Sequence, residues 1–193
     1  MFKRKYEFKP DRTGSGALSK LFVTKKQRLS ILKWVLSGIL LVAASILQDV
    51  VLSRVQLFGT TVNITAALLL MHCIMLDPEV GSTFILSASA LYWFSGSAPG
   101  VYVIALMTVI GVMAGIIRQG YLYDGFGSVI VCTACSFGLY ELVVFGISAF
   151  LGLTTADRLP QHLLGAFLSI CVLPLFYPVI KAIANIGGNT WND

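Results

Sequence analysis

The chain has 193 residues, of which 56% are hydrophobic and only 12% are charged. Soluble domains carry about 25% charged residues, so this composition excludes an ordinary water-soluble globular protein. The 14 basic and 9 acidic residues give a formal net charge of +5. Ten of the basic residues lie within the first 33 positions, so the charge marks one end of the chain and does not indicate a nucleic-acid-binding domain.

The first element in chain order is a basic segment, residues 1–30, which we predict to be a flexible cytoplasmic tail. Basic residues beside a membrane are attracted to anionic lipid by about 1 kcal/mol each. The positive-inside rule also places such residues on the cytoplasmic side, so a role in topology and contact with a specific partner both remain open. No convincing cleavage pattern follows the first apolar run, and we expect that run to stay as an anchor.

Residues 31–186 alternate between long apolar runs and short polar breaks, which predicts an all-α integral membrane protein, a six-helix transmembrane bundle. A helix needs roughly 20 apolar residues to cross a bilayer. Pro78 fits the first turn of the third span, whereas Pro174 and Pro178 predict a kink in the last. We predict that residues 187–193 form a short cytoplasmic tail. The predicted spans are 31–52, 61–76, 78–94, 99–117, 128–151 and 162–184.

The distribution of basic residues predicts the orientation of the bundle. With the amino terminus inside, the inner segments hold the ten basic residues of the first 33 positions together with Arg118 and Lys181. The outer loops hold only Arg54 and Arg158. Cytoplasmic loops carry the excess of Lys and Arg, so both termini are predicted to be cytoplasmic.

The sequence contains no pattern that is typical of an enzyme, a cofactor site or a metal site. His72 and His162 are its two histidines, and they lie in different predicted spans, toward opposite faces of the membrane. The run Ser95-Gly96-Ser97 is better explained as a turn, since Gly and Ser are turn formers. Cys132 and Cys135 have a C-x-x-C spacing, but they lie inside a span without a second metal-binding pair.

Glu141 is the most informative single residue, because it lies near the middle of the fifth predicted span. A charged group at that depth costs a few kcal/mol and marks a functional hypothesis by default. We expect Glu141 to be protonated, to be hydrogen-bonded to polar groups such as Ser or His72, or to face a partner protein. Locking of the bundle and docking of a partner are equally open roles.

Other residues are candidates for the same two roles. Gly111 and Gly115 have the Gly-xxx-Gly spacing that lets helices approach closely, and the small residues 87–90 give the third span a matching face. We therefore predict a tight crossing of the third and fourth spans. The full set of candidate fold-locking or partner contacts is Gln48, Asp49, Asn63, Ser95, Gly96, Gly100, Gly111, Gly115, Glu141 and Pro178.

The order and spacing of several short motifs carry a resemblance to a known family. These motifs are Leu47-Gln48-Asp49-Val50-Val51-Leu52, Asn63, Gly81, Ser95-Gly96-Ser97, Gly100-Val101-Tyr102, Ile110-Gly111 with Gly115, Tyr121-Leu122-Tyr123-Asp124 and Leu175-Phe176-Tyr177-Pro178. In this order they resemble MreD, the rod shape-determining, multi-pass membrane subunit of the bacterial cell-elongation machinery. The resemblance covers about residues 39–186.

The resemblance implies a non-enzymatic role in peptidoglycan synthesis and cell shape. MreD-like proteins belong to the elongasome in the bacterial cytoplasmic membrane. They work there with MreC, with the MreB filament (directly or indirectly), and with RodA and its class B penicillin-binding partner. The resemblance also implies a fold similar to the S components of energy-coupling-factor transporters. Membrane lipid is a further expected partner, and nucleic acid is not.

A substrate-binding S component of an energy-coupling-factor vitamin transporter is the alternative function. Such subunits have a similar length, six spans and small-residue faces. This alternative predicts an outward-facing pocket lined by aromatic and polar residues, to which Tyr92, Trp93 and Tyr102 would contribute.

Overall fold

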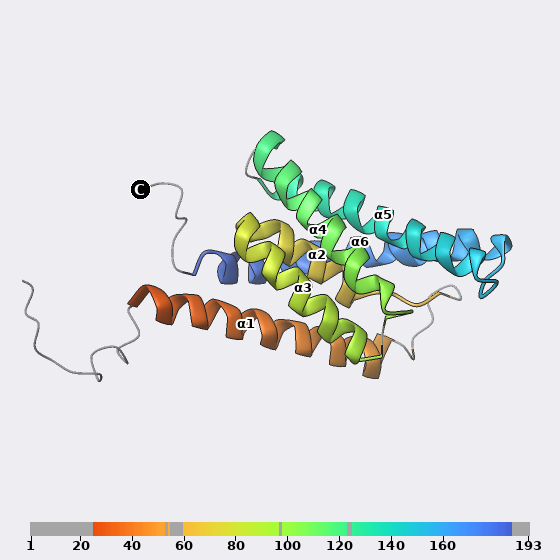
Figure 1. Ribbon diagram of the computed structural model, residues 1–193, viewed down its shortest axis with the longest axis horizontal. Coiled ribbons are helices and arrows are strands. Elements are labelled where there is room, and N and C mark those ends of the chain that lie inside the picture. The colour runs from red at the N-terminus through yellow and green to blue at the C-terminus, as the bar shows by residue number, and fades with distance from the viewer. Residues whose placement is uncertain (1–24, 53, 55–59, 97, 123–124, 187–193) are drawn as a thin grey trace, which may run out of the picture.

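The computed structural model describes residues 25–52, 54, 60–96, 98–122 and 125–186. Residues 1–24 of the predicted basic tail and the predicted tail 187–193 lie outside the described residues. The elements are α1 (Lys25–Leu47), the π-helix η2 (Gln48–Leu52), α2 (Ile64–Met75), α3 (Pro78–Phe94), α4 (Tyr102–Tyr121), α5 (Phe126–Phe150), the 3-10 helix η3 (Ala156–Arg158) and α6 (Leu159–Ala184). The predicted all-α bundle is confirmed for this part of the chain (Figure 1).

Several predicted helix ends differ from the observed ends by a few residues. α3 has the predicted bounds, residues 78–94, with Pro78 in its first turn. α1 begins six residues earlier than the predicted 31, because Lys, Gln and Arg are good helix formers even where the sequence is not apolar. α6 likewise begins at Leu159 rather than at 162, and it continues through Pro174 and Pro178 as one helix.

The short helix α2 forms the centre of the bundle. Every residue from Ile64 to Ile74 is buried, and α2 packs against α1, α3, α4, α5 and α6. In Figure 1, α2 lies between α3 and α6, with α1 along the outer edge of the bundle. At 1.5 Å per residue its 12 residues rise about 18 Å, which is short of a hydrocarbon core of about 30 Å.

Four helical stretches are long and apolar enough to cross a membrane. They are Arg28–Val50, Tyr102–Tyr121, Phe126–Phe150 and Ala156–Ala184. The start of α1 and the end of α6 lie at the same end of the bundle (Figure 1). α3, with 17 residues, is three residues shorter than the shortest of these four.

The distribution of polar and apolar side chains is that of a membrane protein. On α1, large apolar side chains such as Ile31, Val35, Ile39 and Val42 are more than half exposed. Contiguous exposed apolar surface of this kind is rare on soluble monomers. The buried set, in contrast, includes the polar residues Ser37, Thr65, His72, Ser89, Thr133, Ser136, Glu141 and Ser169.

Glycines allow three helices to approach closely near the carboxyl-terminal end of α2. A Cβ atom built on Gly81 of α3 would lie 2.9 Å from the carbonyl oxygen of Cys73. A Cβ on Gly111 of α4 would lie 3.0 Å from Ile85 of α3 and 3.2 Å from the Cys73 Sγ. The predicted close crossing of the third and fourth helices is therefore confirmed at Gly111, whereas a Cβ on Gly115 would meet no atom within 4 Å.

We predict that Gly81→Ala destabilises the bundle and that Gly115→Ala does not. Both changes share the gain in helix propensity of about 1 kcal/mol, but only the first places a methyl group against a backbone carbonyl. Overpacking of this kind costs about 1–3 kcal/mol. Thermal unfolding of the purified variants in one detergent measures the difference, and equal melting temperatures would contradict the packing described here.

Candidate functional site

A buried polar cluster joins four segments of the chain around Glu141 of α5. One Glu141 oxygen (Oε2) lies 2.8 Å from the His162 Nε2 of α6. The other (Oε1) accepts a hydrogen bond of 3.2 Å from the Asn63 amide. The Tyr92 hydroxyl of α3 donates to the Asn63 side-chain oxygen at 3.2 Å. Glu141 and Tyr92 are 6% and 2% exposed, so the carboxylate is held inside the protein by partners from this same chain.

The same cluster closes the amino-terminal end of α2. The Asn63 side-chain oxygen accepts from the Ala66 N–H at 3.3 Å. The Gln48 side-chain oxygen accepts from the Thr65 N–H at 2.7 Å. The Asn63 N–H donates to the Ser169 hydroxyl at 2.9 Å. The first N–H groups of a helix have no partner within the helix, and burying them unpaired is costly, so these side chains make the burial of α2 possible.

The partners of Glu141 include His162 but not His72. One of the three expectations for Glu141, hydrogen bonding to polar groups, is observed, and the partners are Asn63 and His162 rather than Ser or His72. His72 lies in a separate buried cluster, where its Nε2 is 2.7 Å from the Ser37 hydroxyl and its ring lies 4.6 Å from that of Phe84. The two histidines therefore occupy separate sites, as their predicted spans indicated.

A cavity of about 280 Å³ lies beside the Glu141–His162 pair. Its lining combines polar and aromatic side chains with small residues of α6. Gly165 allows α6 to lie close to Thr60, because a Cβ built on Gly165 would lie 2.5 Å from the Thr60 hydroxyl oxygen. The lining residues are Thr60, Thr61, Asn63, Tyr92, Pro99, Tyr140, Glu141, Val144, Ser148, His162, Gly165 and Ala166.

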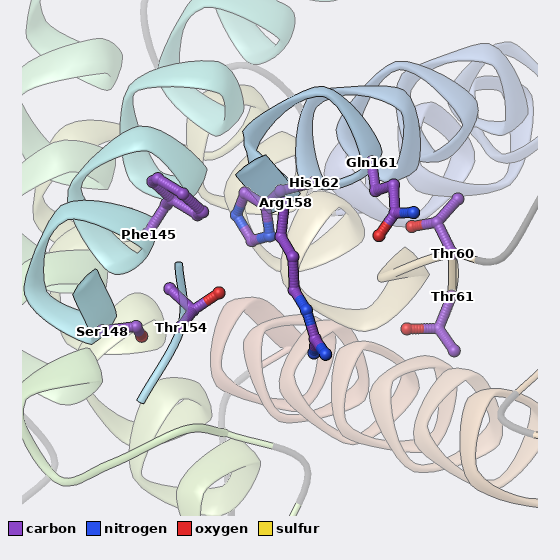
Figure 2. Close-up of a pocket in the computed structure, with 8 residues that line it drawn as sticks. All are labelled: Thr60, Thr61, Phe145, Ser148, Thr154, Arg158, Gln161 and His162. Atoms are coloured by element: carbon purple, nitrogen blue, oxygen red, sulfur yellow. The ribbon is translucent and has the colours of Figure 1, made fainter. Parts of the chain in front are cut away.

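A second cavity of about 270 Å³ adjoins the first and shares Thr60, Thr61, Ser148 and His162 with it. Its other lining residues are Phe145, Thr154, Arg158 and Gln161. Figure 2 shows the Arg158 side chain extending between Thr154 on one side and Thr60 and Thr61 on the other. This second cavity is therefore rich in hydroxyl groups and contains one permanent positive charge.

The remaining sequence candidates lie outside this cluster or at its edge. Asp49 lies in the π-helix η2, next to the capping residue Gln48. Ser95 caps the end of α3, and Gly96 follows with a positive φ of 78°. Gly100 precedes α4, where a Cβ would lie 2.7 Å from the Tyr102 ring. Gly111, Gly115 and Pro178 lie within helices α4 and α6, away from the residues that line either cavity.

Sequence reasoning missed His162, Ser169, Tyr140 and the threonines at 60 and 61 as parts of the site. His162 was placed at the very start of the sixth span, whereas it lies one turn inside α6. The sequence did contain a signal for this contact. A buried carboxylate such as that of Glu141 needs a hydrogen-bond donor, and His162 on the next helix can supply one.

We predict that Asn63→Ala destabilises the protein more than a single lost hydrogen bond would. The change removes the amide donor of the Glu141 Oε1 and the acceptor of the Ala66 N–H, and it removes one hydrogen bond of the Tyr92 hydroxyl. Each buried polar group left unpaired costs about 1–3 kcal/mol. Ser87→Ala is a suitable control, because the exposed Ser87 bonds only to the backbone of its own helix. Equal unfolding curves for the two variants in detergent would contradict the capping role.

We also predict energetic coupling between Glu141 and His162, because their side chains lie 2.8 Å apart with Glu141 buried. A double-mutant cycle with Glu141→Gln, His162→Gln and the combined variant measures that coupling through unfolding free energies. Residues in direct contact give interaction energies of about 0.5–3 kcal/mol. If the changes in unfolding free energy of the two single variants add up to that of the double variant, the contact between Glu141 and His162 does not stabilise the protein.

Comparison of the chain with protein-family models, with curated proteins and with solved structures finds no match in any of the three. The resemblance to MreD therefore rests on the short motifs quoted above.

Proposed function

We propose that this chain is a non-enzymatic, MreD-like subunit of the bacterial cell-wall elongation complex. It crosses the cytoplasmic membrane with six helical segments and has both termini in the cytoplasm. The observation that carries the proposal is the internal pairing of the polar groups. Glu141 binds Asn63 and His162 of the same chain, while long apolar faces point outward. A bundle of this kind presents helix surfaces rather than reactive groups.

The arrangement of the helices supports this topology. The described chain begins and ends at the same end of the bundle (Figure 1), as an even number of crossings requires. α2 is short, but its non-helical approach at residues 60–63 lines the two cavities and caps the helix. Irregular backbone at membrane depth is tolerated where it is buried in protein or lines a cavity. The segment 60–75 can therefore serve as the second crossing.

α1 offers the most accessible surface for partner helices. It lies along the edge of the bundle in Figure 1, and its exposed apolar residues include Ile31, Val35, Ile39 and Val42. Helices associate in membranes through close packing and interhelical hydrogen bonds. On this proposal α1 contacts MreC or the RodA synthase with its class B penicillin-binding partner, and the basic segment before it lies near MreB and anionic lipid.

We predict that the tagged protein, purified from its native membrane in mild detergent, brings MreC, RodA and the penicillin-binding partner with it. Glu141→Gln and Gly111→Leu should each lower this recovery severalfold and make rod-shaped cells rounder, because one loosens the buried cluster and the other separates α4 from α3. Quantitative mass spectrometry and cell-shape microscopy provide the measurements. Normal recovery and normal shape in both variants would contradict a role for these contacts.

One observation favours the S component as a second candidate. The cavity of about 280 Å³ is lined by Tyr92 together with several polar side chains, which is the kind of pocket that a ligand-binding subunit requires. Trp93 and Tyr102, expected beside Tyr92, are not among its lining residues. Recovery of an ATPase pair and a transmembrane coupling subunit in the same purification would support this candidate and overturn the first.

A further inference from the structure

The two adjoining cavities form a single cleft with opposite charge at its two ends. They share Thr60, Thr61, Ser148 and His162. The inner compartment, of about 280 Å³, contains the Glu141 carboxylate. The outer compartment, of about 270 Å³, contains the Arg158 guanidinium. His162, which pairs with Glu141, belongs to both linings, so an acidic group and a basic group line adjoining parts of one cleft.

The inner compartment retains capacity for hydrogen bonds after its internal contacts are formed. The Tyr140 side chain lines this compartment, where its hydroxyl lies within reach of the Tyr92 hydroxyl and still offers an oxygen that can accept a further hydrogen bond. Each Glu141 oxygen is engaged by one side-chain donor, from Asn63 or His162, although a carboxylate oxygen accepts two. A positively charged N–H donor placed here would find a carboxylate oxygen and a phenol oxygen. The rings of Tyr92 and Tyr140 also attract cations.

The outer compartment has the composition of an anion site. Arg158 supplies a planar set of N–H donors that suits a phosphate. The hydroxyl groups of Thr60, Thr61 and Thr154 and the amide of Gln161 line the same space (Figure 2). The first turn of α6 begins beside Arg158, and the amino-terminal end of a helix attracts negative charge.

We propose that this cleft binds a zwitterionic headgroup, a phosphate joined by a short linker to an ammonium group. The ammonium lies in the inner compartment against Glu141 and Tyr140, and the phosphate lies in the outer compartment against Arg158. The two charges of such a headgroup are only a few bonds apart, which matches two adjoining compartments that share a wall. The site shares Glu141 with the buried cluster described above, whereas Arg158 belongs to the cleft and not to the helix surfaces on which the proposed function depends.

The surroundings of the cleft fit a headgroup that is still attached to its lipid. Phe150 and Leu153, which follow the α5 residues of the cleft, are 91% and 73% exposed. Apolar side chains in this position would contact acyl chains. A soluble phosphoethanolamine compound has the same headgroup chemistry, so the experiment below includes both sources.

The test is lipid retention by the purified full-length chain in nanodiscs that contain equal amounts of phosphatidylethanolamine and phosphatidylglycerol. Native mass spectrometry of protein released from the discs counts the lipids that stay bound. We expect phosphatidylethanolamine to be retained about tenfold over phosphatidylglycerol, since the second lacks the ammonium group. Competition with soluble glycerophosphoethanolamine then separates the sources: displacement indicates a free solute, and no displacement indicates the intact lipid.

Two variants and a matched control connect the preference to the cleft. Glu141→Gln removes the negative charge with little change of shape, and Arg158→Gln removes the positive charge from an exposed side chain. Both should reduce the preference by about tenfold. Arg54→Gln, at an exposed arginine outside both linings, should leave it unchanged.

Three results would overturn the proposal. The first is equal retention of the two lipids by the unchanged protein. The second is a preference in Arg158→Gln that equals that of Arg54→Gln. The third is measurable displacement of the bound lipid by the neutral polyol myo-inositol, which carries neither an ammonium group nor a phosphate. If Glu141→Gln fails to fold, the exposed Arg158→Gln and the competition experiment decide the question alone. None of these measurements depends on the recovery of the elongation complex.

Discussion

The burial of α2 is the constraint on which the rest of the structure depends. A 12-residue helix surrounded by five others is buried from its first residue onward. Its first N–H groups must therefore find partners among side chains. Gln48 and Asn63 supply the acceptors, and Ser169 fixes the Asn63 backbone. Asn63 in turn brings Tyr92 and Glu141 to the same place.

This arrangement explains why a carboxylate is found inside an otherwise apolar bundle. A buried charge is costly unless partners compensate it. Glu141 receives a hydrogen bond from Asn63 and lies within contact distance of His162, so α5 and α6 are connected through the group that also orients the cap of α2. The same carboxylate also lines the cleft. Stability at this end of the bundle and the chemistry of the cleft thus depend on the same few atoms.

The positions of the helices could be predicted from the sequence, but most contacts between distant side chains could not. Apolar periodicity and the position of Pro78 predicted α3 with its observed bounds, and the glycine spacing predicted the approach at Gly111. The partner of Glu141 could not be found in the same way. Glu141 lies nine residues before the end of α5, whereas His162 lies three residues after the start of α6. Their meeting depends on how the connection at 151–158 folds back, which no local pattern encodes.

The distance along the chain between the members of the cluster has a consequence for biosynthesis. Asn63 and Ser169 are 106 residues apart in sequence. The ribosome therefore completes α1 to α5 before the last partner of Asn63 exists. During that interval the start of α2 lacks part of its cap, and a short helix in this state gains little from entering the bilayer. The second helix therefore reaches its final packed position late in synthesis, after the sixth helix has been made.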